Sequence, residues 1–175
     1  MPRYIVPPHA RSPKHERYVK KLAQEFTTSS PNIQPIILEE QVPSTKSRHV
    51  RVIWDAWEDL TDEQRSDVIV DAYTRAEGPE AAAEITLAEG MTPHEALALG
   101  MLPFKVVLAR RKTDAVSMAD YQVALNAEAR NTLLGPKAKE LRYARVEDAE
   151  QALQRLKHAL PGSSWAVVQE SAIES

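Results

Sequence analysis

Glycine is scarce in this chain of 175 residues, and its five positions divide the sequence into segments that can form helices and strands. Each glycine lies where a run with helical or strand character ends, a place that commonly needs a turn or a left-handed backbone. None is left for a phosphate-binding loop, in which clustered glycines let backbone amides approach the anion. Nucleotide binding by a Walker-type or dinucleotide-binding loop is therefore not expected. The five glycines are Gly78, Gly90, Gly100, Gly135 and Gly162.

Helical periodicity is clearest over residues 61–77, where apolar side chains form one broad face. Thr61 and Gln64 have the spacing of a capping box, in which each residue satisfies a free amide of the other. A second helix is expected over residues 92–100, because it opens with Thr-Pro, a favoured N-cap followed by a favoured first helical residue. A third helix is expected over residues 14–26.

Two strands are expected between the helix at 14–26 and the helix at 61–77. Val50, Val52 and Trp54 alternate with other residues, which is the period of a strand with one buried face. Residues 36–38 begin an earlier strand, and the polar residues 43–47 form the turn between the two. Strands joined by a short polar loop are typical of a β-hairpin.

Residues 79–89 fit two structures. Three consecutive alanines favour a helix, whereas Ile85-Thr86-Leu87 would suit a short buried strand. The last third of the chain is predicted to alternate between strands and helices: strand 104–109, helix 117–134, strand 141–146, helix 147–160 and strand 165–169.

The composition is that of an ordinary globular protein, with 43% hydrophobic and 27% charged residues. The chain has no cysteine, so disulfides, thiolate metal sites and cysteine nucleophiles are excluded. Its net charge of −3 argues against a surface built as a whole to hold nucleic acid. No apolar run approaches the length of a membrane span and no signal peptide is recognisable. A cytoplasmic protein without a membrane partner is expected.

Residues with catalytic or metal-binding potential form no recognisable motif. The five histidines are scattered, and His94 is interpreted as part of a helix cap. Many carboxylates lie between Asp55 and Asp71, most simply explained as a solvated helix face with acids at its N-terminus. No cofactor, metal ligand or catalytic residue is predicted. An enzyme or metal protein that uses the carboxylates of residues 55–71 stays open as a weaker alternative.

Basic residues gather in three places that could hold phosphates. One is the N-terminal arm, and a second surrounds the strand that begins near residue 104. The third lies at residues 137–145, where Tyr143 could stack on a base. The candidates for contact with nucleic acid are Lys137, Lys139, Arg142, Tyr143, Arg145, Arg110, Arg111 and Lys112.

Two residues of the expected hairpin region are candidates for contact with a protein partner. Trp57 is out of phase with the buried alternation that ends at Trp54, and aromatic residues concentrate at interfaces. Arg51 lies on the opposite face of its strand from Val50 and Val52. Both are therefore predicted interaction residues.

Several short stretches over residues 14–100 resemble the BolA family, a relative of the type II KH fold. BolA proteins show similar stretches in the same order. The order of the predicted elements, namely helix, strand, strand, helix, strand or helix, and helix, also resembles that family. The resemblance implies a strand at Ile85-Thr86-Leu87. The matching stretches are His49-Val50-Arg51-Val52-Ile53, Trp57-Glu58-Asp59-Leu60, Gln64-Arg65, Ile85-Thr86-Leu87 and Thr92-Pro93-His94-Glu95.

The chain departs from the BolA pattern at the residues that carry activity. The family's Arg-His-Arg motif is replaced by Arg65-Ser66-Asp67, and no histidine lies between His49 and His94, where the family's cluster-binding histidine would fall. An iron–sulfur cluster and a glutaredoxin partner are therefore not carried over. The resemblance implies a fold and the character of a binding module.

The sequence predicts an α+β protein with a KH/BolA-like N-terminal part and a C-terminal β-α-β-α-β segment. Its expected function is non-catalytic binding of another macromolecule, with protein preferred as the partner and no cofactor. A nucleic-acid-binding module that uses the arm and the 137–145 patch is the alternative. The expected parts are a basic, proline-rich arm at 1–13, the KH/BolA-like domain at 14–101, the C-terminal segment at 102–170, either packed on it or separate, and a tail at 171–175.

Overall fold

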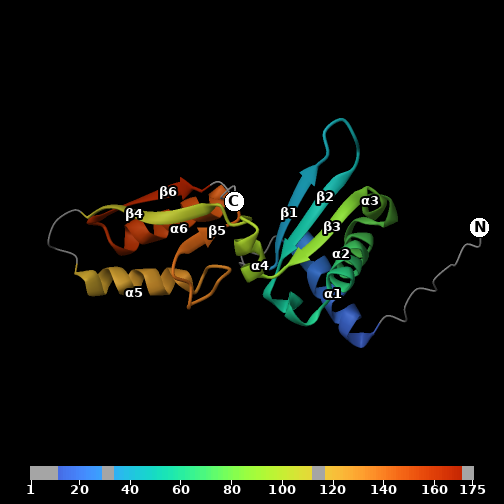
Figure 1. The fold of residues 1–175 in the computed structure, drawn as a ribbon, viewed down its shortest axis with the longest axis horizontal. Coiled ribbons are helices and arrows are strands. Elements are labelled where there is room, and N and C mark those ends of the chain that lie inside the picture. The colour runs from blue at the N-terminus through green and yellow to red at the C-terminus, as the bar shows by residue number, and fades with distance from the viewer. Residues whose placement is uncertain (1–11, 29–33, 112–116, 171–175) are drawn as a thin grey trace, which may run out of the picture. The chain divides into compact units, whose positions relative to one another are not determined.

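The computed structural model describes residues 12–28, 34–111 and 117–170. The chain divides into two compact units, the first formed by residues 1–52 and 59–90 and the second by residues 53–58 and 91–175. Helices and strands are mixed along the chain (Figure 1), which confirms the predicted α+β class. None of the helices within these described ranges is long and apolar enough to cross a bilayer.

The first unit contains a three-stranded sheet in the order β1-β2-β3 and the helices that accompany it. Its helix α1 packs against α2, and Val50 and Val52 of β2 are completely buried, as are Leu22 of α1 and Ile69 of α2. The elements are α1 (Pro13–Thr28), β1 (Ile36–Gln41), β2 (Arg48–Ile53), α2 (Asp62–Glu77), α3 (Pro79–Ala83) and β3 (Ile85–Met91).

Local sequence signals in the first unit form the elements that they predict. The side chains of Thr61 and Gln64 make the reciprocal hydrogen bonds of a capping box at the start of α2. Gly78 follows α2 with a φ of 96°, in the region that favours glycine. The two structures that residues 79–89 could adopt are both present, since α3 ends at Ala83 and β3 begins at Ile85.

The second unit has the predicted β-α-β-α-β order in its C-terminal part. Strand β4 pairs antiparallel with β5 on one side and with β6 on the other. Helix α6 packs against all three strands, and α5 packs against α6 and β5. The elements are a 3₁₀ turn (Asp55–Asp59), α4 (Pro93–Ala98), β4 (Phe104–Arg111), α5 (Met118–Ala129), β5 (Leu141–Tyr143), α6 (Val146–Ala159) and β6 (Ser163–Gln169).

One face of this second sheet is apolar and covered by the helices. Val106 lies opposite Leu141 on β5 and Val167 on β6, and with Tyr143 and Trp165 these side chains belong to the core of the unit. Because side chains alternate along a strand, the other face carries Lys105, Val107, Arg142, Ala166 and Val168.

Two predicted elements end well before the expected residue, the helix at 117–134 and the strand at 141–146. The helix expected to reach residue 134 ends at Ala129, where the buried hydroxyl of Thr132 donates a hydrogen bond to the Ala129 carbonyl and the chain turns. The strand expected to reach residue 146 ends at Tyr143, since Arg145 is already the N-cap of α6. The division between the units follows Gly90, so α4 belongs to the second unit, whereas the sequence suggested a boundary after residue 101.

Candidate functional site

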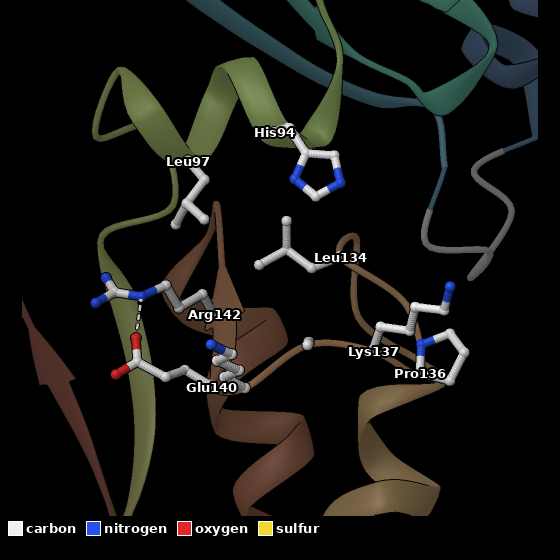
Figure 2. A pocket seen from close by; sticks show the side chains of 9 residues that line it. His94, Leu97, Leu134, Pro136, Lys137, Glu140 and Arg142 are labelled. Atoms are coloured by element: carbon white, nitrogen blue, oxygen red, sulfur yellow. Dashed lines mark hydrogen bonds and ion pairs between the residues drawn. The ribbon is translucent and has the colours of Figure 1, made fainter.

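The second unit contains a hollow of about 580 Å³ beside α4, which Figure 2 shows from close by. One wall is α4 and the other is the chain segment that leads from the end of α5 into β5. The lining residues are His94, Leu97, Leu134, Pro136, Lys137, Ala138, Lys139, Glu140 and Arg142. A hollow of this size is within the range of pockets that hold small ligands or the side chains of a bound peptide.

Helix α4 contributes one side of the hollow through two residues that are three positions apart. Residues at this spacing share one face of a helix, and Figure 2 shows the His94 ring and the Leu97 side chain turned toward Leu134. The start of the helix is fixed by a capping box. The Thr92 amide donates to Glu95 Oε2 at 2.7 Å, and the Glu95 amide donates to Thr92 Oγ1 at 3.2 Å.

The segment opposite α4 is a turn that places two lysines at the rim. Gly135 has a φ of 72°, its amide donates to the Thr132 carbonyl, and its own carbonyl accepts from the Ala138 amide. Lys137 and Lys139 follow this turn and are exposed. Within the described ranges neither lysine forms an ion pair. Their positive charge is therefore available to a ligand.

Glu140 is the single acidic residue among those that line the hollow, and it is already neutralised. Lys105 Nζ lies 2.6 Å from Glu140 Oε1, and Arg142 Nε lies 2.8 Å from Glu140 Oε2. These hydrogen bonds, that of Lys105 first, hold the pKa of the Glu140 carboxyl below its ordinary value. The Arg142 guanidinium is turned toward Glu140 (Figure 2). Glu140 consequently does not cancel the charge of the two lysines.

The structure brings three of the predicted nucleic-acid contacts to this hollow, namely Lys137, Lys139 and Arg142. It does not bring Tyr143 there. Tyr143 is buried, its hydroxyl donates to Glu128 Oε1 at 3.3 Å, and burial raises its pKa. A buried ring offers no face on which a base could stack.

The remaining basic candidates lie elsewhere. Arg145 forms an ion pair with Asp148 in the first turn of α6. Arg110 and Arg111 lie opposite Ser164 and Ser163, at the end of β4 away from Lys105. Lys112 and the arm up to residue 11 are outside the described residues.

The two residues predicted to contact a protein partner are engaged within the chain. Trp57 is completely buried and packs edge to face on Trp54, with ring centroids 5.0 Å apart. Arg51 is partly buried and forms ion pairs with Glu89 and Glu40. Trp57 therefore presents no surface in this conformation, and the guanidinium of Arg51 is held by these two carboxylates.

The carboxylates of residues 55–71 are distributed rather than gathered. Asp59 lies 3.8 Å from Lys14, Asp62 lies 3.5 Å from Arg65, and Asp71 forms a 2.7 Å pair with His15. In the part of the chain that the structure describes, no three histidine, aspartate or glutamate side chains are grouped as metal ligands.

Sequence reasoning identified the basic residues of the hollow but missed its apolar wall. The sequence predicts a helix at Leu134 and only a capping role for His94. The signal that could have indicated the wall is the pair His94 and Leu97 on one face of a short capped helix. Comparison with protein-family models, with curated proteins and with solved structures gave no match.

Proposed function

We propose that the second unit is a non-catalytic binding module whose hollow accepts an acidic, partly apolar segment of a partner protein. One observation carries this proposal. Lys137 and Lys139 stand unpaired, within the described structure, at the rim of an apolar hollow whose one acidic residue, Glu140, is neutralised by Lys105 and Arg142.

The chemistry of the hollow suits a carboxylate next to an apolar side chain. Leu97 and Leu134 supply apolar surface, which favours burial of an apolar group from water. Lysine ammonium groups on flexible stems act as point charges that can approach a carboxylate from several directions. Complementary charge at a rim also steers the partner and excludes basic segments.

The order of elements supports the same character for the N-terminal part. From Pro13 to Met91 the helices and strands follow the order α1-β1-β2-α2-α3-β3, which contains the helix, strand, strand, helix series of the BolA resemblance, followed by both a helix and a strand where the resemblance allowed one of the two. We include a BolA/KH-like fold for this part, and a cytoplasmic location, in the proposal.

Nucleic acid is the second candidate, since Lys137 and Lys139 could hold phosphates. The burial of Tyr143 and the pairing of Arg142 and Arg145 with carboxylates make it the weaker one. A single-stranded oligonucleotide therefore serves as the competing probe.

The experiment is selection of peptides from a random display library on the full chain. Lys137→Glu/Lys139→Glu reverses the charge of the rim. Lys20→Glu/Lys46→Glu is the matched control, because these two lysines are exposed in the first unit. Selected peptides should combine Asp or Glu with apolar residues, and should bind the control variant but not the rim variant.

Three outcomes would overturn the proposal. Peptides without enrichment of acids, or peptides that bind the rim variant as well as the wild type, would place binding elsewhere. Tighter binding of the oligonucleotide, lost in the rim variant, would favour the nucleic-acid candidate.

A further inference from the structure

Strand β6 forms an edge of the second sheet and lacks the features that usually protect such an edge. It pairs with β4 from Gln169 opposite Phe104 to Ser163 opposite Arg111, with a bulge in β4 between Leu108 and Arg110. No backbone partner for its outer side occurs among the described residues. The strand contains seven residues, Ser-Ser-Trp-Ala-Val-Val-Gln, without a charge or a proline. Natural sheet edges are commonly blunted by charges, prolines or shortness.

The other edges differ from β6 in these respects. Strand β5, at the opposite edge of the same sheet, has three residues and carries Arg142 at its centre. In the first unit, β1 carries Glu39 and Glu40, and β3 carries Glu89. The edge formed by β6 is therefore the one in the described structure that is both long and uncharged.

None of the described residues covers the flank of α6 beside β6. A second hollow, of about 560 Å³, is lined by α6 and by Val167 of β6. Leu153 of α6 lines it too, and both side chains pack against the core of the unit while remaining partly exposed. Another strand and helix placed beyond β6 would cover these two side chains.

The charges along this flank indicate what could lie there. Glu147 and Glu150 are in the first half of α6, whereas Lys157 and His158 are in its last turn. All four are exposed. Because their spacing follows the helical repeat, Glu147, Glu150, Gln154 and Lys157 lie along one row. A helix that lies antiparallel beside α6 with the same sequence would bring basic residues opposite acidic ones.

We propose that the β6 edge is the interface of a symmetric homodimer, in which β6 pairs antiparallel with β6 of a second copy about a two-fold axis at Ala166. Such an interface uses the same surface of both copies. Trp165 then lies opposite Val167 of the second copy, so the residues of the covered faces meet. Since α6 and β6 are joined by a tight turn and pack together, the axis that reverses β6 also reverses α6. The two sheets become one of six strands.

The chain offers a clean test of register, because it contains no cysteine. Ala166→Cys places two thiols opposite each other at the axis. Gln169→Cys places them about 20 Å apart, six residues along a strand. A short thiol crosslinker, or oxidation to the disulfide, should join two copies of Ala166→Cys and not of Gln169→Cys. Crosslinking of Gln169→Cys alone, or of neither variant, overturns the proposed pairing.

A second test uses charge exchange and is read by sedimentation velocity over a range of concentrations. The wild type should form a dimer of twice 19.6 kDa. Glu147→Lys/Glu150→Lys makes the flank basic and Lys157→Glu/His158→Glu makes it acidic. Each variant alone should dimerise at least about tenfold more weakly than the wild type, because like charges then face each other. An equal mixture of the two should recover the dimer.

This recovery separates the interface from damage to the fold, because a misfolded variant is not rescued by mixing. A wild type that stays monomeric over the whole range overturns the proposal. So does a dimer that is insensitive to both charge variants, which would use another surface.

Discussion

Lys105 and Arg142 occupy directly opposed positions on β4 and β5, and the carboxylates of Glu140 and Glu170 lie between their charges. Like charges opposite each other in an antiparallel pair are destabilising on their own. Here Lys105 Nζ approaches Glu140 Oε1 to 2.6 Å and Glu170 Oε1 to 3.7 Å, and Arg142 binds both carboxylates. The network neutralises Glu140 and so leaves the rim lysines of the hollow uncompensated.

Replacement of Glu140 by glutamine should lower stability in a pH-dependent way. The pKa of Glu140 is depressed in the folded state, first by the hydrogen bond from Lys105 and then by that from Arg142. The Glu140 carboxylate therefore contributes its full stabilisation at pH values above the pKa of glutamate in the unfolded chain. This stabilisation is lost as the pH falls through the lower pKa of Glu140 in the folded protein. Since the Glu140 side chain is 41% exposed, we expect Glu140→Gln to lower the free energy of unfolding by about 0.5–1 kcal/mol at neutral pH.

Urea unfolding at several pH values measures this effect. The difference between wild type and Glu140→Gln should shrink below about pH 4.5, the ordinary range of glutamate. The control is Glu80→Gln, which removes an exposed carboxylate in α3. A difference that stays constant from neutral to acidic pH would refute the role assigned to Glu140.

Trp57→Ala tests whether this residue is part of the core. Trp57 is completely buried against Trp54, so its removal should lower the free energy of unfolding by about 3–5 kcal/mol. Chemical denaturation of the full chain gives the value. A loss of less than about 1 kcal/mol, typical of surface positions, would instead agree with a contact residue for a partner.

Arg155→Ala should lower the stability of the fold more than removal of both partners of the Arg155–Glu128 ion pair. Glu128 is buried, and Arg155 donates to both of its carboxylate oxygens, at distances down to 2.5 Å. The single substitution leaves a buried carboxylate without its cation. Since Arg155 is half exposed, we expect Arg155→Ala to lower the free energy of unfolding by about 2–4 kcal/mol. Glu128→Leu/Arg155→Leu should be the more stable variant in urea unfolding, and the reverse order would contradict this explanation.

Gly135 can be tested by comparing alanine with asparagine. Its φ of 72° strains an alanine, whereas nothing lies within 4 Å of an added Cβ. Gly135→Ala should therefore lower the free energy of unfolding by about 1–2 kcal/mol through backbone strain. Gly135→Asn should lower it less, because asparagine adopts this conformation more readily. Thermal unfolding measures both. Equal losses would indicate that φ at this position is not what matters.

Local signals in the sequence predicted most of the helices and strands. The Thr61–Gln64 capping box and the N-cap Thr92 followed by Pro93 are signals between neighbouring residues, so tertiary structure was not needed to recognise them. The end of α5 was not predictable, because it depends on how Thr132 is buried and bonded. Trp57 was misleading for a similar reason. The 3₁₀ turn at Asp55–Asp59 interrupts the period of two and returns the ring to the core.

The candidate site was predictable only in part. Charge alone singled out Lys137, Lys139 and Arg142, since a basic cluster is visible in any sequence. The neutralisation of Arg142 depends on Glu170, which is 28 residues away. The hollow itself depends on α4 lying beside the segment that follows Gly135, and contacts between such distant segments carry no local pattern.

Calorimetric titration of the full chain with a display-selected acidic peptide tests the central claim most directly. Lys137→Glu/Lys139→Glu should weaken the peptide's affinity at least about tenfold, because two attractive charges become repulsive, while Lys20→Glu/Lys46→Glu leaves the affinity unchanged. Equal affinities for the wild type and the rim variant would contradict the account.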